Sequence, residues 1–260
     1  MRRVEPRINP VARINPVAKL GAAAVIGIPL VITLDVVSAA VALVVVLALT
    51  PLAGVGWGEF WRRTGIVWVL APLTGLTIAL YGQTSGTVFF EWFIVRVSEG
   101  SLVLAAATTL RVLAIALPSV VLFTTVDPTD LADGLAQVVR LPARFVMGAL
   151  AGLRMVGLLL DDWRELQLAR RARGVADRGR IRRFLGMAFA LLVLSIRRGT
   201  KLSTAMEARG FGAPVTRTWA RPSRFGAAEW MLLALAAAIA AVALGAAIAA
   251  GTWNVILAPR

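Results

Sequence analysis

The sequence predicts an all-α integral membrane protein with about five transmembrane helices and a cytoplasmic module of long, part-apolar helices. Hydrophobic residues make up 58% of the chain and its mean hydropathy is +0.79, which is more apolar than a typical soluble domain. Apolar runs that approach the roughly 20 residues needed to cross a bilayer recur along the chain. The positive charges gather in a few segments between these runs, as expected of a membrane protein with a fixed orientation.

Five apolar runs are expected to cross the membrane, and they cover residues 20–34, 36–54, 64–82, 101–126 and 227–250. Only Asp35 separates the first two runs, so they form either two short helices with a tight turn or one bent hydrophobic unit. Prolines within or beside the runs are compatible with membrane helices, because neighbouring groups can satisfy the freed carbonyls. The connection at residues 83–100, which carries Phe89 and Phe90, is expected to be an interfacial segment.

The distribution of Lys and Arg predicts the orientation. Of 28 such residues, 5 lie in residues 1–19, 2 in residues 55–63 and 18 in residues 127–226. The positive-inside rule then places the N-terminus and residues 127–226 in the cytoplasm and the C-terminus outside. The basic N-terminal segment is interrupted by prolines and lacks a cleavage signal, so we expect a retained arm. The chain is thereby divided into residues 1–126, 127–226 and 227–260.

The basic region of residues 127–226 is expected to hold three helices. The first begins near Asp127, which can cap it, with Pro128 in its first turn. The next two cover about residues 142–173 and 181–209, and each passes from an apolar half to a basic half. The apolar core of the last one, residues 184–194, is too short to span a bilayer.

The two long helices end alike, in LQLARRARG and LSTAMEARG. Gly174 and Gly210 lie where a left-handed helix cap is expected, and Arg173 and Arg209 lie where a cation favours the helix dipole. Helices of about 30 residues are roughly 45 Å long. Because a short connection makes them antiparallel or crossed neighbours, their C-terminal ends lie tens of Å apart. The pattern is compatible with ordinary helix caps, and equally with one arginine offered to each of two similar partners.

The chain resembles the transmembrane T component of energy-coupling factor (ECF) transporters, vitamin and metal-ion importers of the ABC superfamily. The resemblance covers nearly the whole chain and rests on NPVAKL, LRVLAIALPSVVLFTTVDPTDLADGL, RLPARFVMGALAGLRMV, RRARG and AMEARGFGAP. It implies a non-catalytic subunit that links two ABC-type ATPase subunits to a small substrate-binding membrane subunit. It also implies that ATPase docking falls to these residues of the two coupling helices: Ala172, Arg173, Gly174, Ala208, Arg209 and Gly210. Since Arg170 and Arg171 lie beside Arg173, the docking arginine of the first helix stays open.

An intramembrane arginine, Arg111, lies in the fourth apolar run. Such a residue usually faces the helix bundle or a cavity. We expect it to contact carboxylates of the cytoplasmic helices, a partner subunit or a backbone carbonyl.

Several function classes are disfavoured. The chain has no Cys and no His, no Walker A motif and no nucleophile–base constellation, so we expect neither an enzyme nor a cofactor or metal site. Segregation of the charge beside membrane segments argues for lipid and against nucleic acid as a partner. Two alternatives to the transporter subunit are a basic membrane-anchored scaffold without ATPases and a secondary transporter, the latter disfavoured because no paired carboxylates occupy a span.

Overall fold

The computed structural model describes residues 10–33, 35–54, 56–82, 85–92, 95–174, 179–213 and 218–253. These residues are almost entirely helical, which confirms the predicted all-α membrane protein. The chain divides into two compact units. Unit 1 comprises Met1–Gly134 and Ser223–Arg260, and unit 2 comprises Leu135–Pro222. Unit 2 is therefore an insertion in the sequence of unit 1.

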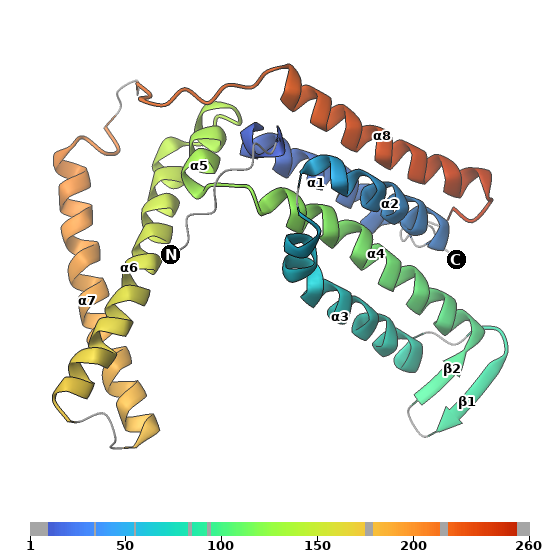
Figure 1. Ribbon diagram of the computed structural model, residues 1–260, viewed down its shortest axis with the longest axis horizontal. Coiled ribbons are helices and arrows are strands. Elements are labelled where there is room, and N and C mark those ends of the chain that lie inside the picture. The colour runs from blue at the N-terminus through green and yellow to red at the C-terminus, as the bar shows by residue number, and fades with distance from the viewer. Residues whose placement is uncertain are drawn as a thin grey trace. The chain divides into compact units, whose positions relative to one another are not determined.

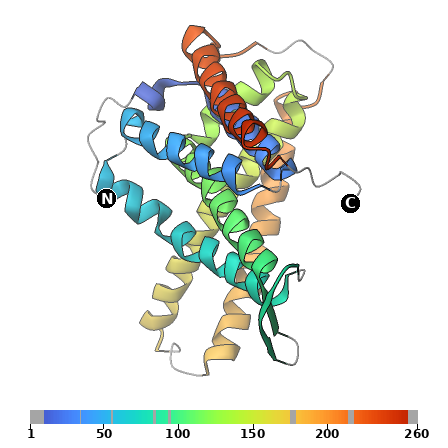
Figure 2. The same cartoon turned by 90° about the vertical axis from the view of Figure 1, so that its right-hand side faces the viewer.

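In the described part of unit 1, the long apolar helices pack as a bundle: α1 (Pro16–Ile32), α2 (Val36–Leu49), α3 (Trp57–Tyr81), α4 (Glu99–Phe123) and α8 (Ala227–Ala249). Helix α1 packs against α8 and α4, and α2 packs against the same two helices (Figure 1, Figure 2). The core consists mainly of small and branched apolar side chains, including Ala22, Ile26, Ala114, Leu117 and Ala243. Small side chains allow close backbone approach, which drives helix association where lipid offers no hydrophobic gain.

The first two apolar runs form separate short helices. Helix α1 has 17 residues and α2 has 14, or about 26 and 21 Å, both shorter than a hydrocarbon core of about 30 Å. Asp35 caps α2, because its carboxylate accepts hydrogen bonds from the backbone N–H (2.6 Å) and hydroxyl (2.7 Å) of Ser38. The predicted second span to residue 54 was too long, since α2 ends at Leu49 and Thr50–Ala53 form a 3-10 turn (η2).

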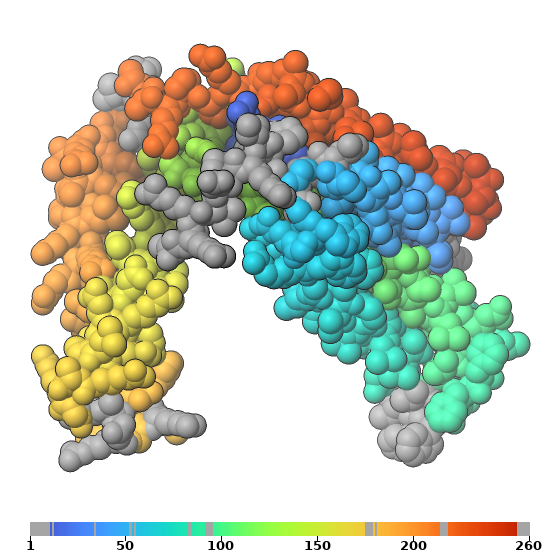
Figure 3. Space-filling view, in the orientation of Figure 1, coloured from blue at the N-terminus to red at the C-terminus, as the bar shows by residue number. Residues whose placement is uncertain are grey.

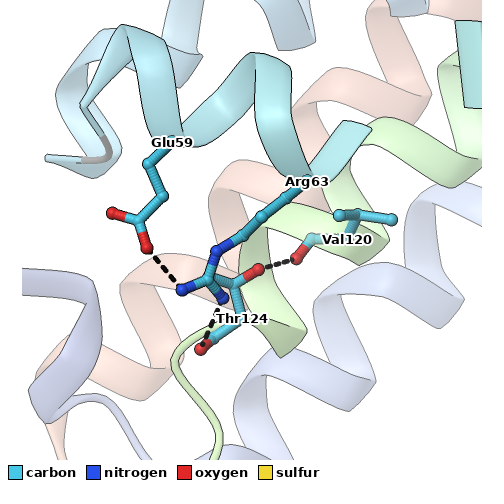
Figure 4. A network of polar contacts seen from close by, with 4 residues as sticks. All are labelled: Glu59, Arg63, Val120 and Thr124. Atoms are coloured by element: carbon cyan, nitrogen blue, oxygen red, sulfur yellow. Dashed lines mark hydrogen bonds and ion pairs between the residues drawn. The ribbon is translucent and has the colours of Figure 1, made fainter. Parts of the chain in front are cut away.

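Helix α3 begins at Trp57, earlier than the run expected from residue 64. Trp57 stacks on the buried ring of Phe60 (5.6 Å between centroids), and Glu59 forms an ion pair with Arg63 one turn later. Arg63 also donates to the carbonyl oxygen of Thr124 (3.4 Å) at the end of α4 (Figure 4). Side-chain contacts thus extend the helix into a stretch that hydropathy alone left out.

The connection between α3 and α4 is a β-hairpin, which the sequence analysis did not predict. Strands β1 (Val88–Trp92) and β2 (Val95–Ser98) are antiparallel, with Glu91 opposite Arg96 and an irregular register between Val88 and Phe90. An ion pair of 2.7 Å joins Glu91 and Arg96 across the strands. Phe89 and Phe90 are exposed. The aromatic and branched residues beside them favour strands, and the expectation of an interfacial segment made no use of this signal.

Unit 2 contains the end of α5 (Pro128–Gln137) and two long helices, α6 (Ala143–Ala172) and α7 (Arg180–Ala208). Helix α5 begins beside the predicted Asp127, and α6 and α7 begin and end within a few residues of the predicted limits. By length and composition, α3, α4, α6 and α8 are long and apolar enough to cross a membrane. Three of these correspond to predicted spans, whereas α6 was expected in the cytoplasmic module.

Candidate functional site: the ends of helices α6 and α7

Helices α6 and α7 are antiparallel neighbours whose C-terminal ends lie at opposite ends of the pair (Figure 1). Figure 3 shows their surfaces in yellow and orange. The 29 residues of α7 make it about 43 Å long. Since α7 starts shortly after α6 ends, Arg173 and Arg209 are separated by a distance on the order of 40 Å.

The end of α6 is a left-handed glycine cap. Arg173 is the C-cap residue, and its N–H donates to the carbonyl of Ala169 at 3.2 Å. Gly174 follows with a φ of 66°, and its N–H donates to the carbonyl of Arg171 at 3.0 Å. This conformation favours glycine, because a Cβ atom would crowd the adjacent carbonyl.

The end of α7 has the same geometry, completed by one more hydrogen bond. Gly210 has a φ of 75° and donates to Glu207 at 2.9 Å, while Phe211 donates to Met206 at 2.9 Å. These two bonds form a Schellman motif. The predicted left-handed caps are therefore confirmed at both helix ends.

Both capping arginines are exposed, as are their neighbours Ala172, Gly174, Ala208 and Gly210. Within the described part of the chain, the side chains of Arg173 and Arg209 form no hydrogen bond or ion pair. A helix C-terminus attracts cations, so both guanidinium groups are held at a favourable end while their donors stay available.

Arg170 differs from Arg173, because it packs between the two helices. A Cβ added to Gly186 of α7 would lie 3.0 Å from Nη2 of Arg170, so this guanidinium already covers the glycine. Arg171 and Arg183 line the same crevice. Arg173 is the C-cap residue, and its side chain forms no hydrogen bond or ion pair with the residues that the structure describes.

An ion pair and an aromatic contact hold α6 and α7 together. Nη2 of Arg198 donates to Oδ1 of Asp162 at 2.9 Å, and Nη1 lies 2.6 Å from Oδ2. The rings of Trp163 and Phe184 meet edge to face at 5.6 Å. Asp162 and Arg198 lie 36 residues apart, so no local sequence pattern pairs them.

The apolar halves of both helices are largely exposed. Their exposed side chains include Phe145, Leu153, Val156, Leu158 and Leu160 in α6 and Phe184, Leu185, Phe189, Leu192, Val193 and Ile196 in α7. Gly148, Gly152 and Gly157 are open as well, since an added Cβ would meet nothing within 4 Å. Such a surface suits lipid or an apolar partner rather than water.

Arg111 lies inside unit 1, on α4, and is 8% exposed. Asp35 at the start of α2 is the acidic group whose charge acts on it. Its Nε and Nη2 atoms have no hydrogen-bond partner among the described residues. Among those residues there is also no group of three or more acidic, His or Cys side chains that could hold a metal ion.

Fold and site together define an α-helical, multi-pass membrane protein in which an inserted pair of helices presents an arginine at the C-cap of each helix. A family model described as "Cobalt transport protein" (CbiQ) matches residues 8–219. The chain is also similar to proteins named energy-coupling factor transporter transmembrane protein EcfT. The one from Limosilactobacillus fermentum is 27% identical over 69% of this chain and 73% of its own length. The one from Streptococcus equi is 27% identical over 81% of each chain.

The chain therefore belongs to the CbiQ family and is a transmembrane component of an ECF-type transporter. This agrees with the resemblance drawn from the sequence. A relative from Lacticaseibacillus paracasei, 28% identical over 72% of this chain and 75% of its own length, carries the same name.

Proposed function

We propose that this protein couples two ABC-type ATPase subunits to a small substrate-binding membrane subunit of an importer for a vitamin or a metal ion. The chain itself is non-catalytic in this proposal, and ATP is hydrolysed by its partners. The observation that carries the proposal is the pair of C-cap arginines, which no described residue pairs with, at ends of antiparallel helices about 40 Å apart. Two similar groove-bearing subunits side by side would each receive one of them.

The chemistry of the caps supports docking. A guanidinium carries five donors in a planar fork and can bind a carboxylate or several carbonyls in a partner groove. Because the backbone of each cap is fixed by a glycine with positive φ, the arginine is held at a defined place on the helix end. The glycines and exposed apolar side chains of α6 and α7 would receive the substrate-binding subunit, which can slide over a surface that lacks bulk at Gly148, Gly152 and Gly157.

The charge distribution supports an orientation in which α6 and α7 face the cytoplasm. Eighteen of the 28 Lys and Arg residues lie in residues 127–226, on the predicted inner side. The N-terminus would share that side, and the C-terminus would be external.

Pull-down of the ATPases by Arg173→Ala, Arg209→Ala and the double variant tests the proposal. A charge-assisted contact is worth roughly 1.5–3 kcal/mol, so each single variant should weaken binding about ten- to a hundredfold. The double variant should also lose ATP-driven uptake, measured with Co²⁺, Ni²⁺ and a panel of water-soluble vitamins. Lysine should rescue poorly, because it lacks the planar fork.

Arg197→Ala is a matched control, since Arg197 is an exposed arginine of α7 away from the cap. If the double variant binds the ATPases and imports like the wild type, the two arginines do not dock the ATPases and the two endings are only helix caps. Failure of the wild type to bind any ATPase would favour a lipid-bound scaffold.

A further inference from the structure

The inserted unit 2 leaves and re-enters unit 1 at neighbouring points. The chain passes out of unit 1 after Gly134 and returns at Ser223. A Cβ added to Gly134 would lie 3.6 Å from the Ser223 hydroxyl oxygen, 2.7 Å from Cγ2 of Val17 and 2.9 Å from Oδ1 of Asn15. Both connections thus meet at the start of α1, within the NPVAKL segment.

Asn15 holds the returning connection with several hydrogen bonds. Its Nδ2 donates to the Ser223 hydroxyl at 2.8 Å and to the carbonyl of Arg224 at 3.0 Å. Its own N–H donates at 3.1 Å to Glu229 in the first turn of α8. Oδ1 accepts from the N–H of Val17 at 3.0 Å and so caps α1. We call Asn15, Val17, Gly134, Ser223, Arg224 and Glu229 the Asn15 junction.

Lys19, one turn further along α1, holds the outgoing connection. This lysine is fully buried, and its Nζ donates to the Thr125 hydroxyl (2.8 Å) and carbonyl (3.4 Å) just after α4. The charge of Asp130 in α5 acts on the same group. Arg63 of α3 binds the neighbouring carbonyl of Thr124 (Figure 4). Two cations therefore bind the carbonyls of Thr124 and Thr125, at and just past the C-cap of α4, where the helix dipole favours them.

The two connections remain paired just past the boundary, within unit 2. Nε2 of Gln137, at the end of α5, donates to the carbonyl of Arg221 at 2.8 Å. A displacement of either connection therefore disturbs hydrogen bonds with the other.

We propose that the Asn15 junction, assisted by Lys19, fastens the two points at which the chain leaves and re-enters unit 1, Gly134 and Ser223, to the membrane helices. A displacement that reaches either point is then passed to α1, α4 and α8. Asn15 acts in this scheme as a positioning residue. The inference rests on the proposed function, because it assigns the path by which ATPase movement enters the membrane helices.

Amide hydrogen exchange of the purified full chain tests the fastening without any partner. Asn15→Ser is the informative variant, because serine caps a helix about as well as asparagine but is too short to reach Ser223 and Arg224. Losing these two hydrogen bonds should speed exchange in residues 223–229 by about tenfold or more. Gly134→Ala should do the same by displacing Asn15 and Val17. Gly245→Ala is its control, since a Cβ there meets nothing within 4 Å.

Uptake per ATP hydrolysed tests the transmission in the assembled transporter, using the same ions and vitamin panel. Asn15→Ser and Gly134→Ala should retain ATPase pull-down while uptake per ATP falls about tenfold, and Gly245→Ala should match the wild type. Unchanged exchange, or unchanged uptake per ATP despite faster exchange, overturns the inference. So does lost pull-down in the junction variants. A wild-type chain that binds no ATPase refutes the proposed function and with it the transmission, while the exchange result still decides whether Asn15 fastens the connections.

Discussion

Arg198 of α7 and Asp162 of α6 form an ion pair that joins the two long helices, with a hydrogen bond of 2.9 Å from Nη2 to Oδ1 and 2.6 Å between Nη1 and Oδ2. The aspartate is buried whereas the arginine is partly exposed, so the pair lies at the edge of the α6–α7 interface. It fixes which faces of the helices meet, because a fork-shaped guanidinium accepts few orientations of a carboxylate. The positions of the C-cap arginines, Arg173 and Arg209, relative to one another depend on how α6 and α7 are aligned by this pair.

Removal of this ion pair should loosen the helix pair. Asp162→Ala leaves the guanidinium of Arg198 without its partner, and we expect a loss of roughly 1–3 kcal/mol in the free energy of unfolding. Denaturation of the detergent-solubilised chain measures this loss, and a double-mutant cycle with Arg198→Ala isolates the coupling. Arg197→Ala is the control. Additive effects of the two single variants would mean that the ion pair contributes nothing.

The two cap glycines should resist substitution. Gly174→Ala and Gly210→Ala place a Cβ in the left-handed region, which costs about 1–2 kcal/mol, so the last helical turn should fray or reorient. Faster amide exchange in that turn, together with weaker ATPase binding, is the expected result. Gly148→Ala, in open space within α6, should leave both measurements unchanged or slightly stabilise the helix. Wild-type exchange in both cap variants would show that the caps do not need glycine.

Arg111 and Asp35 should depend on each other. Asp35→Asn keeps a residue that can cap α2 but removes the negative charge that acts on Arg111. The charge interaction is on the order of 1–2 kcal/mol. Asp35→Asn should therefore lower the stability of the wild-type chain more than it lowers the stability of a chain that already carries Arg111→Met. Thermal unfolding in detergent of the four chains provides the comparison. Equal effects in both backgrounds would exclude a functional charge interaction between the two residues.

Labelling from outside intact cells should follow the charge distribution. The chain contains no cysteine, so single cysteines can be introduced and probed with an impermeant thiol reagent. Thr87→Cys before the hairpin should react, whereas Ser203→Cys in α7 should react only after the membrane is permeabilised. Both side chains are exposed, so burial does not confound the comparison. Labelling of Ser203→Cys from outside intact cells would contradict the proposed orientation.

Some features of the site could be predicted from the sequence because they depend on nearby residues. The limits of α6 and α7 and the conformations of Gly174 and Gly210 follow from propensity, capping and the helix dipole, which act over a few residues. The hairpin was missed because a short strand pair beside apolar runs has no strong hydropathy signal. The early start of α3 was missed for a related reason, since it depends on aromatic stacking and on the Glu59–Arg63 pair.

The sequence by itself determined the membrane class, the family, the two long helices and the places where their arginines lie. Only the tertiary structure decided that the guanidinium of Arg170 packs against Gly186 of the other helix. It also decided that Asn15 meets Ser223, 208 residues along the chain, and that Arg198 meets Asp162. The physical reason is that helical periodicity and capping are local, whereas contacts between distant segments depend on how whole helices pack.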